Sequence, residues 1–130
     1  MKSEEKNFLL ELLQTPSPTG FEIPGQRVWA NYTRKFADEV TCDSYGSTWA
    51  ILKGNSERTV MLEAHADEIG YMIKHIDDNG FLRIDRVGGS DSATGRGRRL
   101  RILGDKGEVT GIIGNTAIHL RRDELGSEKA

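Results

Sequence analysis

The sequence has little of several features that would assign a protein to a class. It contains one cysteine, Cys42, which excludes an internal disulfide framework and fits a reducing compartment. Its apolar runs are only a few residues long, far short of the roughly 20 that a membrane-spanning helix needs. Its charge is nearly balanced, with 18 basic and 20 acidic residues. The net charge of −2 gives no bulk field that would favour nucleic acid or an anionic membrane.

The chain also lacks the pattern of a secretory signal peptide. Its first residues, 1–6, lead into an amphipathic stretch with an acid every few residues and not into an uninterrupted apolar region. With 130 residues, 36% hydrophobic and 29% charged, it fits one globular domain, or one domain and part of another. We therefore expect a soluble cytoplasmic protein with no membrane and no nucleic-acid partner.

Two helices are predicted before the first strand. Ser3 suits the N-cap of the first, and Pro16 and Pro18 end that helix. The second is expected from about Pro24, a residue that favours the first turn. Its apolar residues recur at helical spacing, which we interpret as a core-facing stripe. They are Val28, Trp29, Tyr32 and Phe36.

Beyond these helices the pattern changes to short strands. Strands are predicted over residues 40–42, 49–52, 59–64, 71–76, 81–87, 100–103 and 109–113. Thr59–Ala64 is an apolar run typical of a strand buried on both faces. Asn79-Gly80 predicts a tight hairpin turn, because these residues tolerate positive φ angles. Helices and strands up to about residue 66, followed by strands alone, predict an α/β fold.

The most informative chemistry lies where the predicted strand 59–64 ends. His65 can bind a metal through one ring nitrogen, and Asp67 can accept a hydrogen bond from the other. Alternation along an extended chain puts both on one side. By spacing alone, a hydrogen-bonded histidine at a strand end is the more ordinary interpretation, since His-x-Asp often occurs by chance.

Three motifs around this histidine change that balance. They are Thr15–Glu22 (TPSPTGFE), Asp43–Ser47 (DSYGS) and Ala64–Gly70 (AHADEIG). In this order and spacing they resemble the dinuclear metalloaminopeptidases known as glutamyl, deblocking or tetrahedral (TET) aminopeptidases, some of which carry an older endoglucanase label. The resemblance covers almost the whole chain and fades after His119.

The resemblance implies a zinc- or cobalt-dependent enzyme that removes N-terminal residues from peptides. It assigns His65 as a ligand of one of two divalent ions and Asp67 as the catalytic-site residue that supports it. It also implies that residues 1–67 begin a three-layer zinc-peptidase-like catalytic domain. Residues 68–130 would begin an inserted β-barrel domain that pairs subunits in a large homo-oligomer.

The remaining ligands of the family have no counterpart in this sequence, since family members are considerably longer. A catalytic zinc site usually has three protein ligands, and one imidazole does not hold two metals. We therefore expect at most one weak metal site and no peptidase activity from this chain alone. The alternative is a non-catalytic oligomerisation module derived from such a peptidase.

Other candidate residues are weaker. His75 lies in a predicted strand, and we interpret it as structural. Cys42 has no cationic neighbour that would activate a thiol. A glycosidase would need a carboxylate pair at a defined separation, which nothing fixes for Glu63, Asp67 and Glu68. The arginines of 96–101 form a basic cluster without interleaved aromatic residues, which favours a solvated loop or a subunit-contact patch over a nucleic-acid site.

Overall fold

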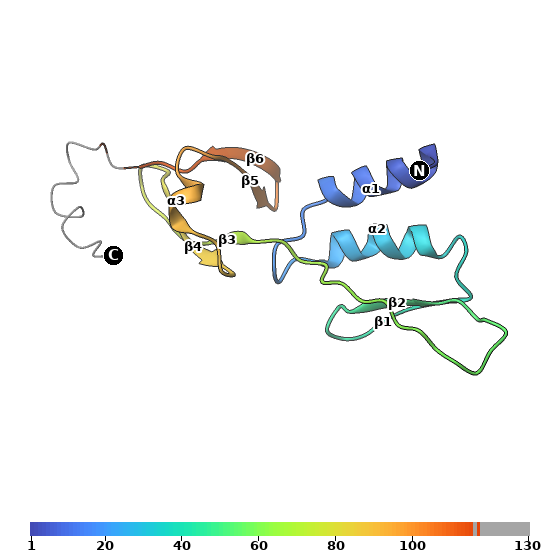
Figure 1. Cartoon of the computed structure of the whole chain (residues 1–130). Coiled ribbons are helices and arrows are strands. Elements are labelled where there is room, and N and C mark those ends of the chain that lie inside the picture. Colours follow the sequence, from blue (N-terminus) through green and yellow to red (C-terminus); the bar gives the residue numbers. More distant parts are fainter. Residues whose placement is uncertain (116, 118–130) are drawn as a thin grey trace. The chain divides into compact units, whose positions relative to one another are not determined.

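The computed structural model describes residues 1–115 and 117, and within them the chain is α/β, as predicted (Figure 1). It divides into two compact units, Met1–Gly89 and a second from Ser90 onward, and each is described by itself. In chain order the elements are α1 (Ser3–Gln14), α2 (Ile23–Thr33), β1 (Glu39–Cys42), β2 (Thr48–Ile51), β3 (Gly70–Ile76), β4 (Leu82–Val87), α3 (Ser92–Gly95), β5 (Arg99–Gly104) and β6 (Gly107–Ile112).

Helix α1 begins where a carboxylate reaches back to the start of the chain. The sequence predicts Ser3 as the N-cap, and this is wrong by one residue, since the N-cap is Lys2. The reason is that the Glu5 carboxylate accepts a hydrogen bond from the Lys2 backbone N–H at 2.8 Å, so Ser3 becomes the first helical residue. The helix ends at Gln14, two residues before Pro16.

Helix α2 has Pro24 in its first turn, as predicted, and it ends before Phe36. Its third residue, Gly25, is buried and packs against the chain that leaves α1. A Cβ atom at Gly25 would lie 2.6 Å from the Ser17 hydroxyl oxygen, so this close approach needs glycine.

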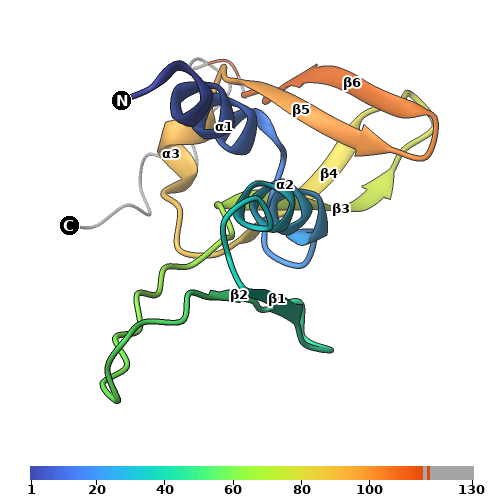
Figure 2. The ribbon, with the colours of Figure 1, turned by 90° about the vertical axis from the view of Figure 1, so that its right-hand side faces the viewer.

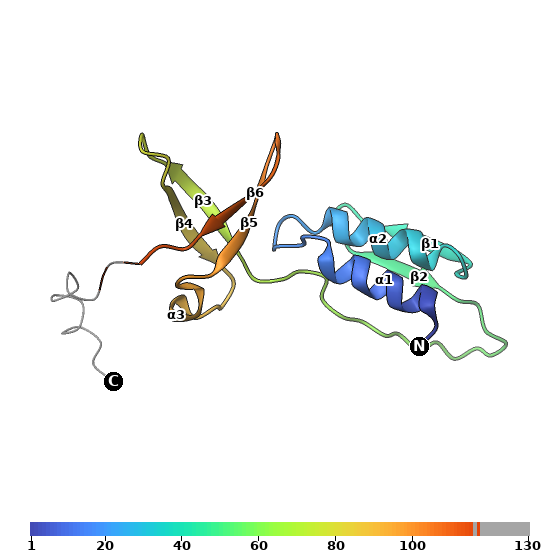
Figure 3. The ribbon, with the colours of Figure 1, turned by 90° about the horizontal axis from the view of Figure 1, so that it is seen from above.

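Helices α1 and α2 lie side by side (Figure 3), and aromatic rings pack between them. The rings of Phe8 and Tyr32 stack with centroids 3.8 Å apart and an interplanar angle of 6°. Phe36 meets the edge of Tyr32 at 5.6 Å. Lys35 lies 5.3 Å from the Tyr32 centroid, and its Nζ donates to Glu4 Oε1 at 2.7 Å. This packing explains why Tyr32 and Phe36 belong to the predicted apolar stripe.

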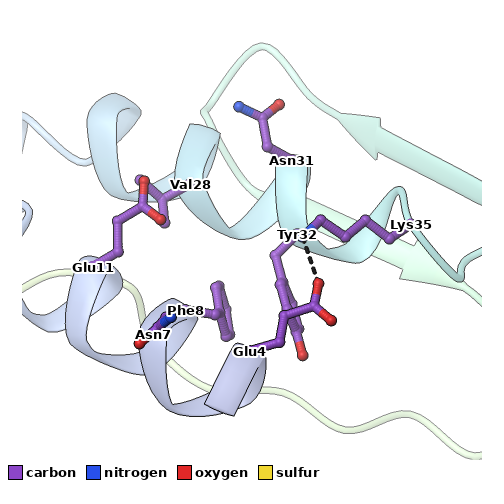
Figure 4. A pocket seen from close by; sticks show the side chains of 8 residues that line it. All are labelled: Glu4, Asn7, Phe8, Glu11, Val28, Asn31, Tyr32 and Lys35. Carbon is purple, nitrogen blue, oxygen red and sulfur yellow. Dashed lines mark hydrogen bonds and ion pairs between the residues drawn. The ribbon is translucent and has the colours of Figure 1, made fainter.

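A pocket of about 390 Å³ opens between the two helices (Figure 4). The stacked rings form part of its wall, and the Lys35–Glu4 ion pair lies at one end. Its other lining residues are Asn7, Glu11, Val28 and Asn31. None of the residues predicted to carry chemistry lines it, so the pocket belongs to the helix packing.

Replacing Phe8 with alanine is expected to lower the free energy of unfolding by about 1–3 kcal/mol, which urea denaturation would measure. The reason is the loss of the stacked ring at a half-buried position. Tyr32→Phe is the matched control, because it keeps the stacked ring. Equal stabilities of the two variants would contradict the assigned role of the stack.

The first hairpin pairs β1 with β2 in antiparallel register, as predicted, and α2 lies over it (Figure 2). Its turn is fixed by Asp43, whose Oδ1 accepts hydrogen bonds at 2.9 Å from the amides two and four residues later. Gly46 follows with a φ of +91°, a conformation that favours glycine. Sequence, turn chemistry and packing therefore agree here.

The strand predicted over Thr59–Ala64 is not formed, and its predicted burial is also wrong. Figures 1 and 2 show the segment as an extended trace without pairing, and Val60, Met61 and Leu62 are 82%, 77% and 94% exposed. A strand needs neighbours for its backbone N–H and C=O groups. Among the described residues the strands form three two-stranded hairpins, and none of them pairs with this segment.

The second hairpin pairs β3 with β4, which confirms the predicted strands and turn. Asp77 Oδ1 accepts hydrogen bonds from the Asn79 and Phe81 amides at 3.0 and 2.9 Å. Gly80 has a φ of +82°, as the Asn-Gly signal predicts. The register shifts between Ile73 and His75, which marks a bulge in β3.

In the second unit, β5 pairs with β6 in antiparallel register, confirming strands predicted near residues 100–103 and 109–113. Arg101 donates from Nε and Nη2 to the two carboxylate oxygens of Glu108 at 2.8 and 2.7 Å, which lowers the pKa of Glu108. On the same hairpin, a Cβ at Gly111 would lie 2.6 Å from Ile102 Cδ1. His119 lies outside the described residues.

The described chain buries few side chains. Within residues 1–115 and 117, Ala30 is the one buried apolar side chain, at 6% exposure. Leu13, Ile23 and Phe36 remain 70%, 57% and 53% exposed although they belong to the helices and their flanks. No helix of this part is long and apolar enough to cross a bilayer. Each unit, taken by itself, is therefore stabilised more by local hairpin pairing and helix packing than by a central core.

Candidate functional site

His65 and Asp67 lie in the extended connection between β2 and β3, and their side chains meet there. The His65 Nδ1 atom lies 3.0 Å from Asp67 Oδ1 and 2.9 Å from the Asp67 backbone oxygen. The contact expected from their two-residue spacing is thus present, although the strand on which that expectation rested is absent. The His65 side chain is 85% exposed.

The two oxygens around Nδ1 define which tautomer the ring adopts. Both are hydrogen-bond acceptors, so Nδ1 must donate, and a neutral His65 carries its proton there. The lone pair is then on Nε2, to which no described residue is hydrogen-bonded. A metal-binding histidine needs this arrangement, with one nitrogen bonded to a carboxylate or carbonyl and the other unprotonated.

Thr19 completes the polar contacts of Asp67. Its hydroxyl Oγ1 donates to Asp67 Oδ2 at 2.6 Å, across 48 residues of sequence. This hydrogen bond lowers the pKa of the Asp67 carboxyl below its ordinary value, and the contact with His65 lowers it further. Asp67 therefore stays ionised, and each of its oxygens has a separate partner.

Backbone contacts bring these distant segments together. Two hydrogen bonds join Glu68 to Ser17. The Ser17 backbone N–H donates to Glu68 Oε1 at 2.9 Å, and the Glu68 backbone N–H donates to the Ser17 backbone oxygen at 2.8 Å. The Thr19 amide donates to the Glu68 oxygen at 3.3 Å. Pro18 and Glu68 form an isolated parallel bridge, and a Cβ at Gly70 would lie 2.8 Å from Pro18 Cβ. The chain after α1 is thus anchored beside residues 67–70.

From the residues alone, Thr15–Gly20 reads as a helix stop, and that interpretation is incomplete. The segment also supplies Thr19 to Asp67 and Ser17 to Glu68. No local pattern predicts a contact between segments 48 residues apart. The signal that could have predicted this contact is that the motifs TPSPTG and AHADEIG occur together in the family that the sequence resembles.

The other candidate residues do not join this cluster. His75 is exposed on β3, and Cys42 is an exposed free thiol. Glu63 is exposed, and the hydrogen-bond partners of Asp67 in the described structure are Thr19 and His65. Among the described residues, no three histidine, cysteine or acidic side chains converge on a point where they could hold a metal ion.

Comparison with known proteins places the chain in a family. Residues 46–130 match the M42 glutamyl aminopeptidase family. A lysyl aminopeptidase from Pyrococcus furiosus is 36% identical over 117 residues, covering 89% of this chain and 34% of the relative. The chain therefore spans about a third of the length of that relative.

Solved structures agree with the sequence comparison. A TET aminopeptidase from a marine-sediment archaeon of the Thaumarchaeota has a TM-score of 0.89 and 28% identity, covering 99% of this chain and 36% of its own. The TET1 peptidase of Pyrococcus horikoshii, which can assemble into a tetrahedron or a large octahedral shell, has a TM-score of 0.76 and 32% identity. That match covers 92% of this chain and 36% of the TET1 chain. With the order of motifs around His65, these matches identify the chain as a member of the M42 glutamyl aminopeptidase family.

Proposed function

We propose that this chain is the N-terminal part of a dinuclear metal-dependent aminopeptidase, which removes N-terminal residues from peptides with a metal-activated water. The observation that carries the proposal is the His65 ring, with Nδ1 bonded to Asp67 and Nε2 left for a ligand. The match of residues 46–130 to an aminopeptidase family supports the reaction class. Peptides are the proposed substrate.

His65 and Asp67 fit the role of one ligand of such a metal site and the residue that orients it. His65 would contribute Nε2 to one of the ions, zinc or cobalt, and Asp67 would hold the imidazole without binding the ion itself. When bound, the ions supply Lewis-acid chemistry that polarises a carbonyl and activates water. The chain's own contribution is to present an unprotonated nitrogen in a fixed orientation.

We propose that the chain alone is inactive. One imidazole falls short of the three protein ligands that a catalytic zinc ion normally has. The absence of a converging third ligand among the described residues supports this. The remaining ligands would come from polypeptide equivalent to the two thirds of the longer relatives that this chain does not match.

The proposed domain arrangement follows the same relatives. Residues 1–67 would begin a three-layer catalytic domain, for which the packing of α2 on β1–β2 gives a first helix layer over a sheet. The exposed segment Thr59–Ala64 would become a strand of that sheet once its neighbours are present. Residues 68–130 would begin the inserted β-barrel domain. We place the complete protein in the cytoplasm as a homo-oligomer, in keeping with the TET1 assemblies.

The direct test completes the site. The chain is joined in frame to the unmatched C-terminal two thirds of the Pyrococcus furiosus lysyl aminopeptidase, and the purified product is assayed with amino-acid p-nitroanilides and zinc or cobalt. We call this product the completed protein. Turnover that a chelator removes is expected, because the product has all ligands. A folded completed protein that never turns over any such substrate would contradict the proposed function.

A non-catalytic oligomerisation module is the second candidate. It is favoured by the free edges of the two-stranded hairpins and by the exposed apolar segment, since unpaired backbone and apolar surface promote association. Sedimentation separates the two ideas. A stable, monodisperse oligomer of this chain supports the module, whereas a chain that aggregates without the missing C-terminal part supports the fragment.

A further inference from the structure

We propose that Thr19 is a positioning residue for the metal-ligand site: its hydroxyl holds the Asp67 carboxylate so that the carboxylate, together with the Asp67 backbone oxygen, fixes the orientation and tautomer of His65. The inference rests on the proposed function for its meaning, but the hydrogen bonds themselves can be tested without any peptidase activity. Thr19 lies in the loop between α1 and α2, 46 residues before His65 in the sequence. It belongs to the motif Thr15–Glu22, but the residue types of that motif predict only the end of a helix.

The carboxylate of Asp67 divides its two oxygens between two partners. Oδ2 accepts from Thr19 Oγ1 at 2.6 Å, and Oδ1 lies 3.0 Å from His65 Nδ1. A carboxylate bonded at both oxygens has its rotation restricted, because turning it breaks one bond or both. Thr19 thus fixes the plane in which Oδ1 meets the imidazole.

His65 depends on these hydrogen bonds because packing does not hold it. Its side chain is 85% exposed, whereas the Asp67 side chain is 35% exposed. An exposed imidazole without polar contacts rotates among its staggered conformers and exchanges between tautomers. The set Thr19–Asp67–His65 therefore supplies the orientation that a buried ligand would obtain from its neighbours.

The loop that carries Thr19 is held independently of its hydroxyl. Three hydrogen bonds join Ser17 and the Thr19 backbone to Glu68, and none uses Thr19 Oγ1. Pro18 also packs against Gly70, where a Cβ would approach to 2.8 Å. Removing the hydroxyl should therefore be a local change, so its effect on His65 can be separated from an effect on the fold.

The test reads the ring nitrogens of His65 by ¹⁵N NMR of the chain, under alkaline conditions that keep imidazole neutral. Thr19→Val replaces the hydroxyl by a methyl group of similar size, and Thr19→Ser keeps the hydroxyl. The ratio of the Nδ1-protonated to the Nε2-protonated form is expected to fall in Thr19→Val, by at most about tenfold, which is the full effect of losing the hydrogen bond between His65 Nδ1 and Asp67 Oδ1. The fall is limited because the Asp67 backbone oxygen, 2.9 Å from Nδ1, still accepts from it. Thr19→Ser should restore the ratio, and His75 serves as the internal reference.

Several outcomes would overturn the inference. A ratio unchanged in Thr19→Val, while Asp67→Asn changes it, would show that Asp67 needs no support from Thr19. A Thr19→Ser variant with a ratio as low as that of Thr19→Val would show that the hydroxyl alone does not position Asp67. The amide shifts of Ser17 and Glu68 report whether the loop stays anchored, and if they move in Thr19→Val, Thr19→Ala takes its place with the same criterion.

The inference and the proposed function fail separately. A tautomer ratio that follows the Thr19 hydroxyl, in a chain whose completed protein shows no peptidase activity, would support the positioning role and contradict the function. An active completed protein, with a tautomer ratio that does not change in Thr19→Val, would support the proposed function and contradict the positioning role.

Discussion

Replacing His65 with alanine is expected to reduce the peptidase activity of the completed protein by at least about a thousandfold. The imidazole would bind one ion through Nε2. Among the described residues, no group of three histidine, cysteine or acidic side chains could hold a metal ion in its place. A loss of several kcal/mol of transition-state stabilisation corresponds to a factor of this size, since each 1.36 kcal/mol is tenfold. Steady-state kinetics with an amino-acid p-nitroanilide, together with the metal content of the purified variant, would measure it.

The matched control is His75→Ala. Both histidines are exposed, but His75 lies on β3, whereas His65 is hydrogen-bonded to Asp67. Its loss should change activity by no more than about twofold, as for a surface substitution away from the site. Asp67→Asn should fall between the two, at about 10- to 100-fold, the usual effect of losing a residue that orients a metal ligand. Equal losses for His65→Ala and His75→Ala would contradict the assignment.

Introducing aspartate at both Val60 and Leu62 is expected to convert a self-associating chain into a soluble monomer. The two side chains are 82% and 94% exposed, and alternate positions of an extended segment share one face. An apolar, strand-prone face without a partner promotes pairing between chains. Two carboxylates on that face oppose pairing, because burying them unpaired costs several kcal/mol. Sedimentation velocity over a range of concentrations would measure the change.

Asn55→Asp with Ser56→Asp is the control for charge. It adds the same two negative charges to exposed positions of the same connection, outside the apolar segment. We expect this control to associate like the original chain. In the completed protein, Val60→Asp with Leu62→Asp should instead prevent folding, since both positions would lie in a strand of the sheet. An original chain that is monomeric at all concentrations, or a control as soluble as the test variant, would contradict this account of the segment.

The sequence predicts most of the local structure because local physics determines it. Asp43 and Asp77 bond the amides that follow them, and Gly46 and Gly80 adopt the positive φ angles that their turns need. The hairpins around them form from neighbours in the chain, so periodicity and turn residues are sufficient. The one-residue error at Ser3 arises from a single side-chain bond at the helix start.

The prediction for Thr59–Ala64 fails because a buried strand is a property of the whole sheet. Its apolar run is compatible with a central strand, but central burial needs neighbours on both edges and layers on both faces. In the described structure neither is present, so the residues stay exposed. The apolar run of Thr59–Ala64 is therefore typical of a strand within a complete sheet, and it does not predict the conformation of the segment without that sheet.

The candidate site was predictable only in part. The contact between His65 and Asp67 follows from their spacing, since two residues of extended chain bring the side chains together. The contribution of Thr19 does not, because it depends on a loop anchored by Ser17 and Glu68 across about 50 residues.

The most direct test of the central claim is a peptidase assay of this chain alone, with zinc or cobalt added, beside the completed protein at equal concentration. We propose that the chain contributes His65 and the residues that orient it but not the whole site. We therefore expect no turnover of amino-acid p-nitroanilides above the metal blank from the chain alone, and chelator-sensitive turnover from the completed protein. Metal-dependent turnover by the chain alone would contradict this proposal.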